Sequence, residues 1–151
     1  MDLALAGPIK LRMHLRCTVW TLLFSVLAEA YLETDDVAGA GEVSGRAVAR
    51  ARAMHNLVDG VDAQRIQGKV LSRQGRQNEA NATLESALSR ARSIPYPYAE
   101  AKILHDWGML HALQGEPGRA RERHSAALGI FRRLGASEGA GRTGQALQKL
   151  E

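Results

Sequence analysis

An internal repeat of 40 residues is the feature that most limits how this 151-residue chain can fold. Small residues recur in register at this spacing, as in the pairs Gly68 and Gly108, Gly75 and Gly115, Ala80 and Ala120, and Ala87-Leu88 and Ala127-Leu128. The same register reaches back to Ala28, Ala40 and Ala47, so three copies cover about residues 20–135. A repeat of this length is typical of units that stack on one another.

Composition indicates that each unit is helical. Aromatic residues make up only 5% of the chain, and strand-forming residues are sparse, whereas Ala, Leu, Arg, Gln and Glu are abundant. Gly75, Gly115 and Gly135 are placed to end helices, and Pro117 is placed to begin one. We expect helices near residues 17–34, 37–55, 60–74, 77–93, 97–114, 117–134 and 137–150.

The recurring small residues have a physical explanation. Two antiparallel helices joined by a tight turn can approach closely only where small side chains lie at their crossing. Gly68 or Gly108 on the first helix of a unit, and Ala80 or Ala120 on the second, would provide that space. The prediction is an all-α, right-handed helical solenoid of three antiparallel helix pairs with a C-terminal capping helix.

This pattern resembles the tetratricopeptide repeat family. The third unit carries the family's residues most fully, with Leu104, Trp107-Gly108, His111, Gly115, Ala120, His124 and Ala127-Leu128. The second unit is weaker, because Gln64 and Gln67 stand where apolar residues are expected. The period of 40 exceeds the family's usual length of about 34 residues. It is similar to the C-terminal repeat arrays of bacterial ATP-dependent transcriptional regulators and adenylate cyclases.

The resemblance implies an N-terminal segment over residues 1–16, repeats over 17–56, 57–96 and 97–135, and a cap over 136–151. It also implies a concave groove that is lined by the first helix of each unit and binds a peptide. Helix geometry selects the predicted lining residues, which are Glu29, Glu33, Arg65, Lys69, Arg73, Lys102, His105, Asp106 and Met109. A solvated polar face without a ligand is the alternative for these residues. Some family members clamp a peptide carboxylate, but only Lys102 matches that pattern.

The function expected from the resemblance is a non-catalytic scaffold for a protein or peptide partner, in a bacterial signalling or transcription-regulatory module. No catalytic residue, cofactor or metal site is predicted. One alternative is a metal-binding or enzymatic module that uses His105, Asp106 and His111, although their spacing matches no strong metal motif.

Nucleic-acid binding is a further alternative, because the formal net charge is +4. The densest basic cluster comprises Arg119, Arg121, Arg123, Arg132 and Arg133. Helical spacing would spread these arginines around a helix, and no aromatic platform accompanies them, so nucleic acid is not the expected partner.

Three short patterns resemble functional motifs. Residues 135–143 resemble a phosphate-binding loop, and the glycines between 39 and 45 resemble a dinucleotide fingerprint, but neither has the required spacing or a preceding strand. Asn81 begins a glycosylation sequon within a predicted helix, which we interpret as chance.

The N-terminal region combines charge with an apolar run. Lys10, Arg12 and Arg16 precede an apolar stretch over residues 17–27, a pattern also typical of a signal peptide and too short for a membrane span. The favoured interpretation is a helix that needs cover, by residues 1–15 or by another chain. The hypotheses are a homodimer through Trp20 and Phe24 or the docking of a partner, and another interpretation is that the chain is a piece of a longer repeat array. Cys17 is the only cysteine, which favours a reducing, cytoplasmic location.

Overall fold

The chain folds into a succession of helices joined by short turns. The computed structural model describes the backbone from residue 6 to residue 151, and the side chains from Val19 onward except that of Thr21. The helices are α1 (Ala6–Glu33), α2 (Val37–Ala53), α3 (Leu57–Arg73), α4 (Gln77–Ser93), α5 (Pro97–Leu113), α6 (Pro117–Arg133) and α7 (Ser137–Gln148). No strand occurs among the described residues, and the predicted all-α class is confirmed.

The helices from α2 to α7 begin and end within three residues of the predicted bounds. The first helix differs, because α1 begins at Ala6 and not near residue 17. Residues 6–16, which the sequence analysis assigned to an N-terminal segment, form the first turns of α1. Pro8 lies in the first turn, where a missing N–H costs no helical hydrogen bond.

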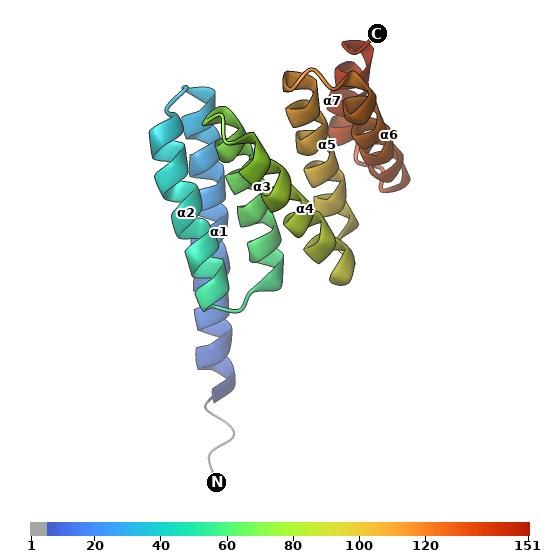
Figure 1. Ribbon diagram of the computed structural model, residues 1–151. Coiled ribbons are helices and arrows are strands. Elements are labelled where there is room, and N and C mark those ends of the chain that lie inside the picture. The colour runs from blue at the N-terminus through green and yellow to red at the C-terminus, as the bar shows by residue number, and fades with distance from the viewer. Residues whose placement is uncertain (1–5) are drawn as a thin grey trace.

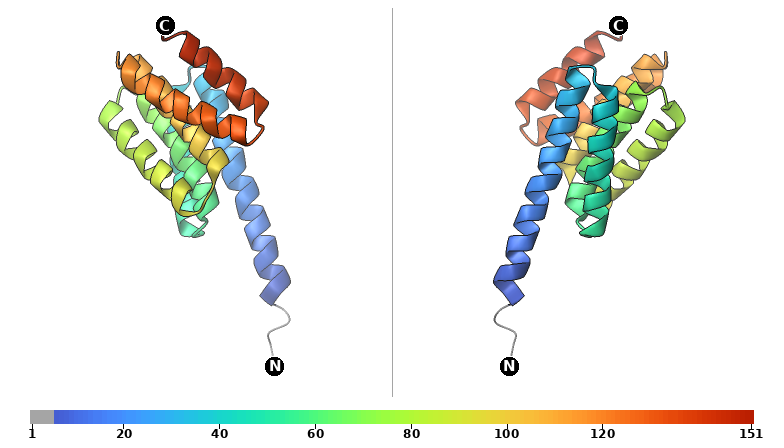
Figure 2. Two further views of the ribbon diagram at one scale, coloured as in Figure 1. Left: turned by 90° about the vertical axis from the view of Figure 1, so that its right-hand side faces the viewer. Right: turned by 90° about the vertical axis from the view of Figure 1, so that its left-hand side faces the viewer.

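Successive helices pack against each other along the array, which runs from α1 and α2 at one side to α6 and α7 at the other (Figure 1). The odd-numbered helices also contact one another, α1 with α3, α3 with α5, and α5 with α7. Within the described residues, α2, α4 and α6 share no such contact. The odd helices therefore form an inner layer and the even helices an outer layer, as in a helical solenoid (Figure 2).

Glycines follow the ends of three helices as predicted, with Gly75 after α3, Gly115 after α5 and Gly135 after α6. Gly75, Gly115 and Gly135 adopt φ of +76°, +73° and +68°, which is the left-handed region that glycine enters without a steric penalty. At the end of α3, the N–H groups of Gly75 and Arg76 donate to the carbonyls of Ser72 and Leu71, so the last turn is closed by two bonds.

Close contact between paired helices depends on glycine. A Cβ atom on Gly68 would lie 2.6 Å from Leu84, and one on Gly108 would lie 2.6 Å from the ring of His124. The crossing predicted at these glycines is confirmed, although large side chains, rather than Ala80 and Ala120, lie directly opposite them.

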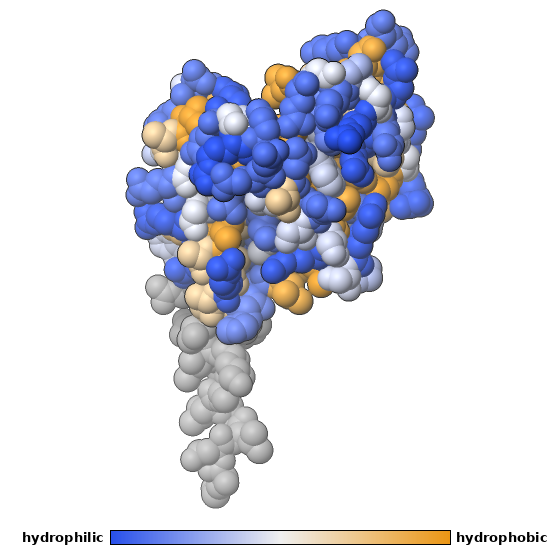
Figure 3. Space-filling model, in the orientation of Figure 1, coloured by the Kyte–Doolittle hydropathy of each residue, from blue (hydrophilic) through white to orange (hydrophobic). Residues whose placement is uncertain are grey.

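Two clusters of buried apolar side chains form the core. The larger one joins α3 to α6 and includes Leu84, Ile103 and Phe131. The smaller one joins α1, α2 and α3 and includes Leu32 and Ile66. The face of the molecule seen in Figure 3 is mostly hydrophilic, with apolar side chains in small separate groups.

The glycine-rich patterns belong to helices and their ends. Residues 135–143 form the turn after α6 and the first half of α7, and Gly39, Gly41 and Gly45 lie inside α2. Neither pattern follows a strand, so the two nucleotide-binding resemblances have no structural support. Asn81 lies within α4, as predicted, and its side-chain oxygen accepts a hydrogen bond from Trp107 Nε1 at 2.7 Å.

The signal-peptide interpretation depends on residues 10–30, and the side chains of residues 10–18 and 21 lie outside the described set. Among the described residues, no helix combines the length and the apolar character needed to span a membrane.

Substituting Gly108 tests the helix crossing. Gly108→Ala should destabilise the fold by roughly 1–2 kcal/mol, because overpacking against His124 exceeds the gain in helix propensity. Gly129 is the matched control, since it is exposed within α6 and a methyl group added there would have no neighbour within 4 Å. Gly129→Ala should stabilise by about 0.5–1 kcal/mol. Urea unfolding measures both, and equal effects of the two substitutions would contradict the crossing.

Candidate functional site

A cavity of about 560 Å³ lies on the concave side of the array. Its lining comes mainly from α1, α3, α5 and α7, with Leu84 of α4 and Phe131 of α6 at its base. All nine residues predicted for the groove line this cavity, namely Glu29, Glu33, Arg65, Lys69, Arg73, Lys102, His105, Asp106 and Met109. The helix periodicity thus selected the correct face, while the binding role of these residues stays a prediction.

Residues 40 positions apart lie side by side across this face. Lys69 Nζ donates to Glu29 Oε1 at 3.1 Å, and Lys102 Nζ donates to Asp62 Oδ1 at 3.0 Å. Each pair joins one odd helix to the next odd helix. Ion pairs between residues 40 positions apart therefore link each repeat unit to the next.

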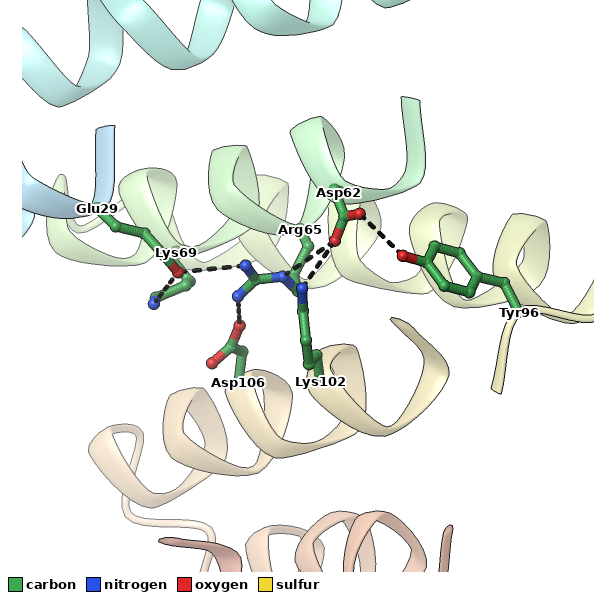
Figure 4. Close-up of polar contacts among 7 residues, drawn as sticks. All are labelled: Glu29, Asp62, Arg65, Lys69, Tyr96, Lys102 and Asp106. Carbon is green, nitrogen blue, oxygen red and sulfur yellow. Dashed lines mark hydrogen bonds and ion pairs between the residues drawn. The ribbon is translucent and has the colours of Figure 1, made fainter. Parts of the chain in front are cut away.

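Arg65 is the centre of this network (Figure 4). Its guanidinium donates to Asp106 Oδ2 of α5 and, at 3.2 Å, to Glu29 Oε1 of α1, and its Nε lies 3.9 Å from Asp62 Oδ1. Arg65 is only 7% exposed. Arg65 and Asp106, both predicted to line the groove, are therefore engaged with each other rather than presented as free charges.

The network favours its charged forms despite burial. Burial raises the pKa of the Asp106 carboxyl, but attraction to Arg65 and Lys69 outweighs burial and leaves that pKa lowered. The same balance, with the same two cations, lowers the pKa of Glu29. Burial lowers the pKa of Arg65, and its neighbours Asp106 and Glu29 reverse this, so the net pKa is raised.

Asp62 also contacts a second group of side chains, which lie at the N-terminal end of α5. Tyr96 donates its hydroxyl to Asp62 Oδ2 at 3.4 Å, and burial, followed by the charge of Asp62, raises the pKa of that phenol. The ammonium group of Lys102 lies 5.5 Å from the centre of the Tyr98 ring. Lys102 is therefore held from two sides, which is why it is not a free carboxylate clamp.

In the wall formed by α5 and α7, His105 lines the cavity, and the buried His124 of α6 lies next to it. Thr143 Oγ1 and His105 Nδ1 are joined by a hydrogen bond of 3.0 Å, and the His105 ring lies 5.2 Å from the His124 ring of α6. Burial lowers the pKa of His105. Burial and the neighbouring His105 lower the pKa of His124 to about 4, so this ring is neutral near pH 7.

His105, Asp106 and His111 do not form a common site. His111 lies 2.7 Å from Glu116 and stacks on Trp107, while Asp106 faces Arg65 and His105 faces Thr143. No group of three or more His, Cys, Asp or Glu side chains suited to a metal ion is found among the described residues. The three-residue metal arrangement considered from the sequence is therefore not assembled.

Three apolar side chains on this face are exposed to solvent. Met109 and Leu113, one helical turn apart on α5, are 45% and 71% exposed, and Tyr98 is 43% exposed. All three line the cavity. Because these three side chains are largely exposed to solvent, their apolar surfaces are available for contact with another molecule.

The contribution of α7 was missed from the sequence. Gly139, Arg142 and Thr143 line the cavity, although α7 was predicted only as a cap. The repeat itself contains the signal, since Arg142 and Thr143 stand 40 residues after Lys102 and Ile103.

The arginine cluster is dispersed over α6. Arg119, Arg121, Arg132 and Arg133 are exposed, and Arg123 lies with its guanidinium carbon 4.1 Å from the centre of the Trp107 ring. Arg121 donates to the carbonyl of Leu150, and Arg119 lies beside Glu116.

Comparison with known proteins supports the fold. No family model and no curated protein sequence matches the chain. Among solved structures, the chain is similar to BtubC (BKLC) from P. vanneervenii, with a TM-score of 0.76 and 20% sequence identity. The match covers 96% of this chain but only 59% of the BtubC chain, so the chain spans less than two thirds of that protein. At this identity the likeness establishes the all-helical fold alone.

Removing Arg65 should be costly. Arg65→Met leaves the buried Asp106 and its neighbour Glu29 without their shared cation, and we expect a loss of about 3–5 kcal/mol in unfolding free energy. Arg73 provides the control, because its pair with Asp35 is 45% and 81% exposed at the two side chains. Arg73→Met should cost less than about 1 kcal/mol. Similar losses in the two variants would show that the network is not structural.

Acid should weaken the fold through His124. The unfolded chain binds a proton on this ring below its usual pKa of about 6.5, whereas the folded chain does so only near pH 4. Stability should therefore fall by roughly 2–3 kcal/mol between pH 7 and pH 4.5. Glu29 and Asp106, with lowered pKa values, act in the same direction at lower pH. Denaturation at several pH values should show a flatter profile for His124→Gln, and an unchanged profile would contradict the assignment.

Proposed function

We propose that this chain is a non-catalytic scaffold of the tetratricopeptide type, which binds a peptide or protein segment in its concave groove. The observation that carries this proposal is the cavity of about 560 Å³, lined by successive inner helices and left open to solvent. A groove built from several rigid helices suits an elongated ligand, because each helix can contact a different part of it.

The residues that line the groove fall into two groups, those that hold the inner helices together and those that are exposed to a ligand. Arg65, Asp106 and Glu29 hold the inner helices together, so they form a fixed floor. Met109 and Leu113 project from α5 with large exposed fractions. We propose that these two side chains provide the apolar contacts with the ligand, since apolar anchors surrounded by polar groups are typical of peptide sites.

The wider context is also a proposal. The 40-residue period is similar to that of repeat arrays in bacterial regulatory proteins, and it supports a role as a signalling or transcription-regulatory module. In such a role the chain would bring a partner to a defined place and leave the chemistry to other proteins.

Selection of peptides from a displayed random library tests the groove. Peptides selected on the wild-type chain should lose at least about tenfold in affinity for Met109→Glu and for Leu113→Glu, because a charge replaces an apolar contact. Leu57→Glu is the matched control, since Leu57 is 55% exposed and lies outside the cavity.

The control variant should bind the selected peptides as the wild type does. Peptides that bind all three variants equally would place the binding surface elsewhere. Failure to select any peptide above background would count against a peptide-binding function.

A further inference from the structure

One face of α1 carries an unusual density of exposed apolar side chains. Six large ones within nine residues are between 38% and 62% exposed, namely Val19, Trp20, Leu22, Leu23, Val26 and Leu27. The sequence led to the hypothesis that Phe24 takes part in a dimer contact. In the structure, Phe24 packs against the smaller core cluster and lies beneath the guanidinium of Arg46. The exposed surface is therefore centred on Leu22 and Leu23 rather than on Phe24.

The other inner helices bury the surface that α1 leaves open. The position of Leu23 corresponds, at intervals of 40 residues, to Ala63, Ile103 and Thr143, each of which is 0% exposed. Val26 corresponds to Ile66, which is also fully buried and packs in the cluster shared with the preceding α1 and α2. These side chains form the interface between one helix pair and the pair before it.

We propose that this face of α1, defined by the six residues above, joins a second copy of the chain in a symmetric homodimer. The equivalent surfaces of α3, α5 and α7 are buried against the preceding helix pair. The matching face of α1 therefore has the shape and apolar character of a buried interface. None of the six residues that define this face lines the groove, where α1 contributes Glu29, Leu32 and Glu33, so this proposal does not depend on peptide binding.

The opposite end of the array does not complement this face. The exposed residues of α7 are glycine or polar residues, including Glu138, Arg142, Gln145 and Gln148. A head-to-tail contact would therefore place apolar groups against charges. Contact between two copies of the same face avoids this mismatch and gives a closed pair with twofold symmetry.

The exposed area is sufficient for such a pair. Six side chains with these exposed fractions present on the order of 500 Å² of surface, so two copies would bury roughly 1,000 Å², which is near the lower bound for a specific interface. An apolar patch of about this size is among the largest that a typical monomer exposes, and such patches are often binding surfaces.

Sedimentation equilibrium over about 1 to 100 µM protein tests the proposal. The wild-type chain should reach twice its mass of 16.4 kDa within this range. The double variant Leu23→Glu with Val26→Glu should associate at least about 100-fold more weakly, because it places four carboxylates in the apolar interface. The substituted residues are exposed, so circular dichroism and urea unfolding should show the variant folded.

The matched control is Leu57→Glu with Val58→Glu, which adds the same charge at side chains that are 55% and 47% exposed on α3. This control should form the dimer as the wild type does. The proposal is overturned by a wild-type chain that stays monomeric at the highest concentration, by a dimer that survives the α1 substitutions, or by equal loss in the control. A monomer that instead sediments with phosphatidylcholine vesicles would assign the face to lipid and would also overturn it.

Discussion

Close approach of paired helices at glycine sets the spacing on which the rest of the architecture depends. Gly68 lies against Leu84 and Gly108 against His124, with no room for a methyl group at either crossing. Because both crossings use the same register, the helix pairs have the same geometry and stack with equivalent positions in line. The pairs Glu29 with Lys69 and Asp62 with Lys102 are direct results, since each joins residues 40 apart.

Equivalent positions in successive repeat units carry side chains with different structural roles. Val26 is exposed, Ile66 is a core residue, and Asp106 is part of the buried ion-pair network, although all three occupy the same place in successive units. The helix pairs keep the same arrangement although these side chains differ. Substitution along such a column can therefore change the local chemistry without changing the fold.

Much of this arrangement could be predicted from the sequence because its signals are local and periodic. Gly75, Gly115 and Pro117 mark helix ends by their backbone preferences, and helix geometry placed nine residues on the correct face. The start of α1 was missed, since Lys10, Arg12 and Arg16 break the apolar pattern without breaking the helix. The engagement of Arg65 with Asp106 was also missed, because periodicity assigns a residue to a face but does not reveal which distant charge it meets.

The paired state of the groove cations has a consequence for recognition. Arg65, Lys69 and Lys102 already contact carboxylates of the chain, so an acidic ligand group would compete with Glu29 or Asp62 for them. The exchange replaces one ion pair by another and leaves a protein carboxylate to be solvated. Charge alone therefore gives little net preference for an anionic ligand. Discrimination among ligands then depends on how well their apolar parts fit the open surface of α5.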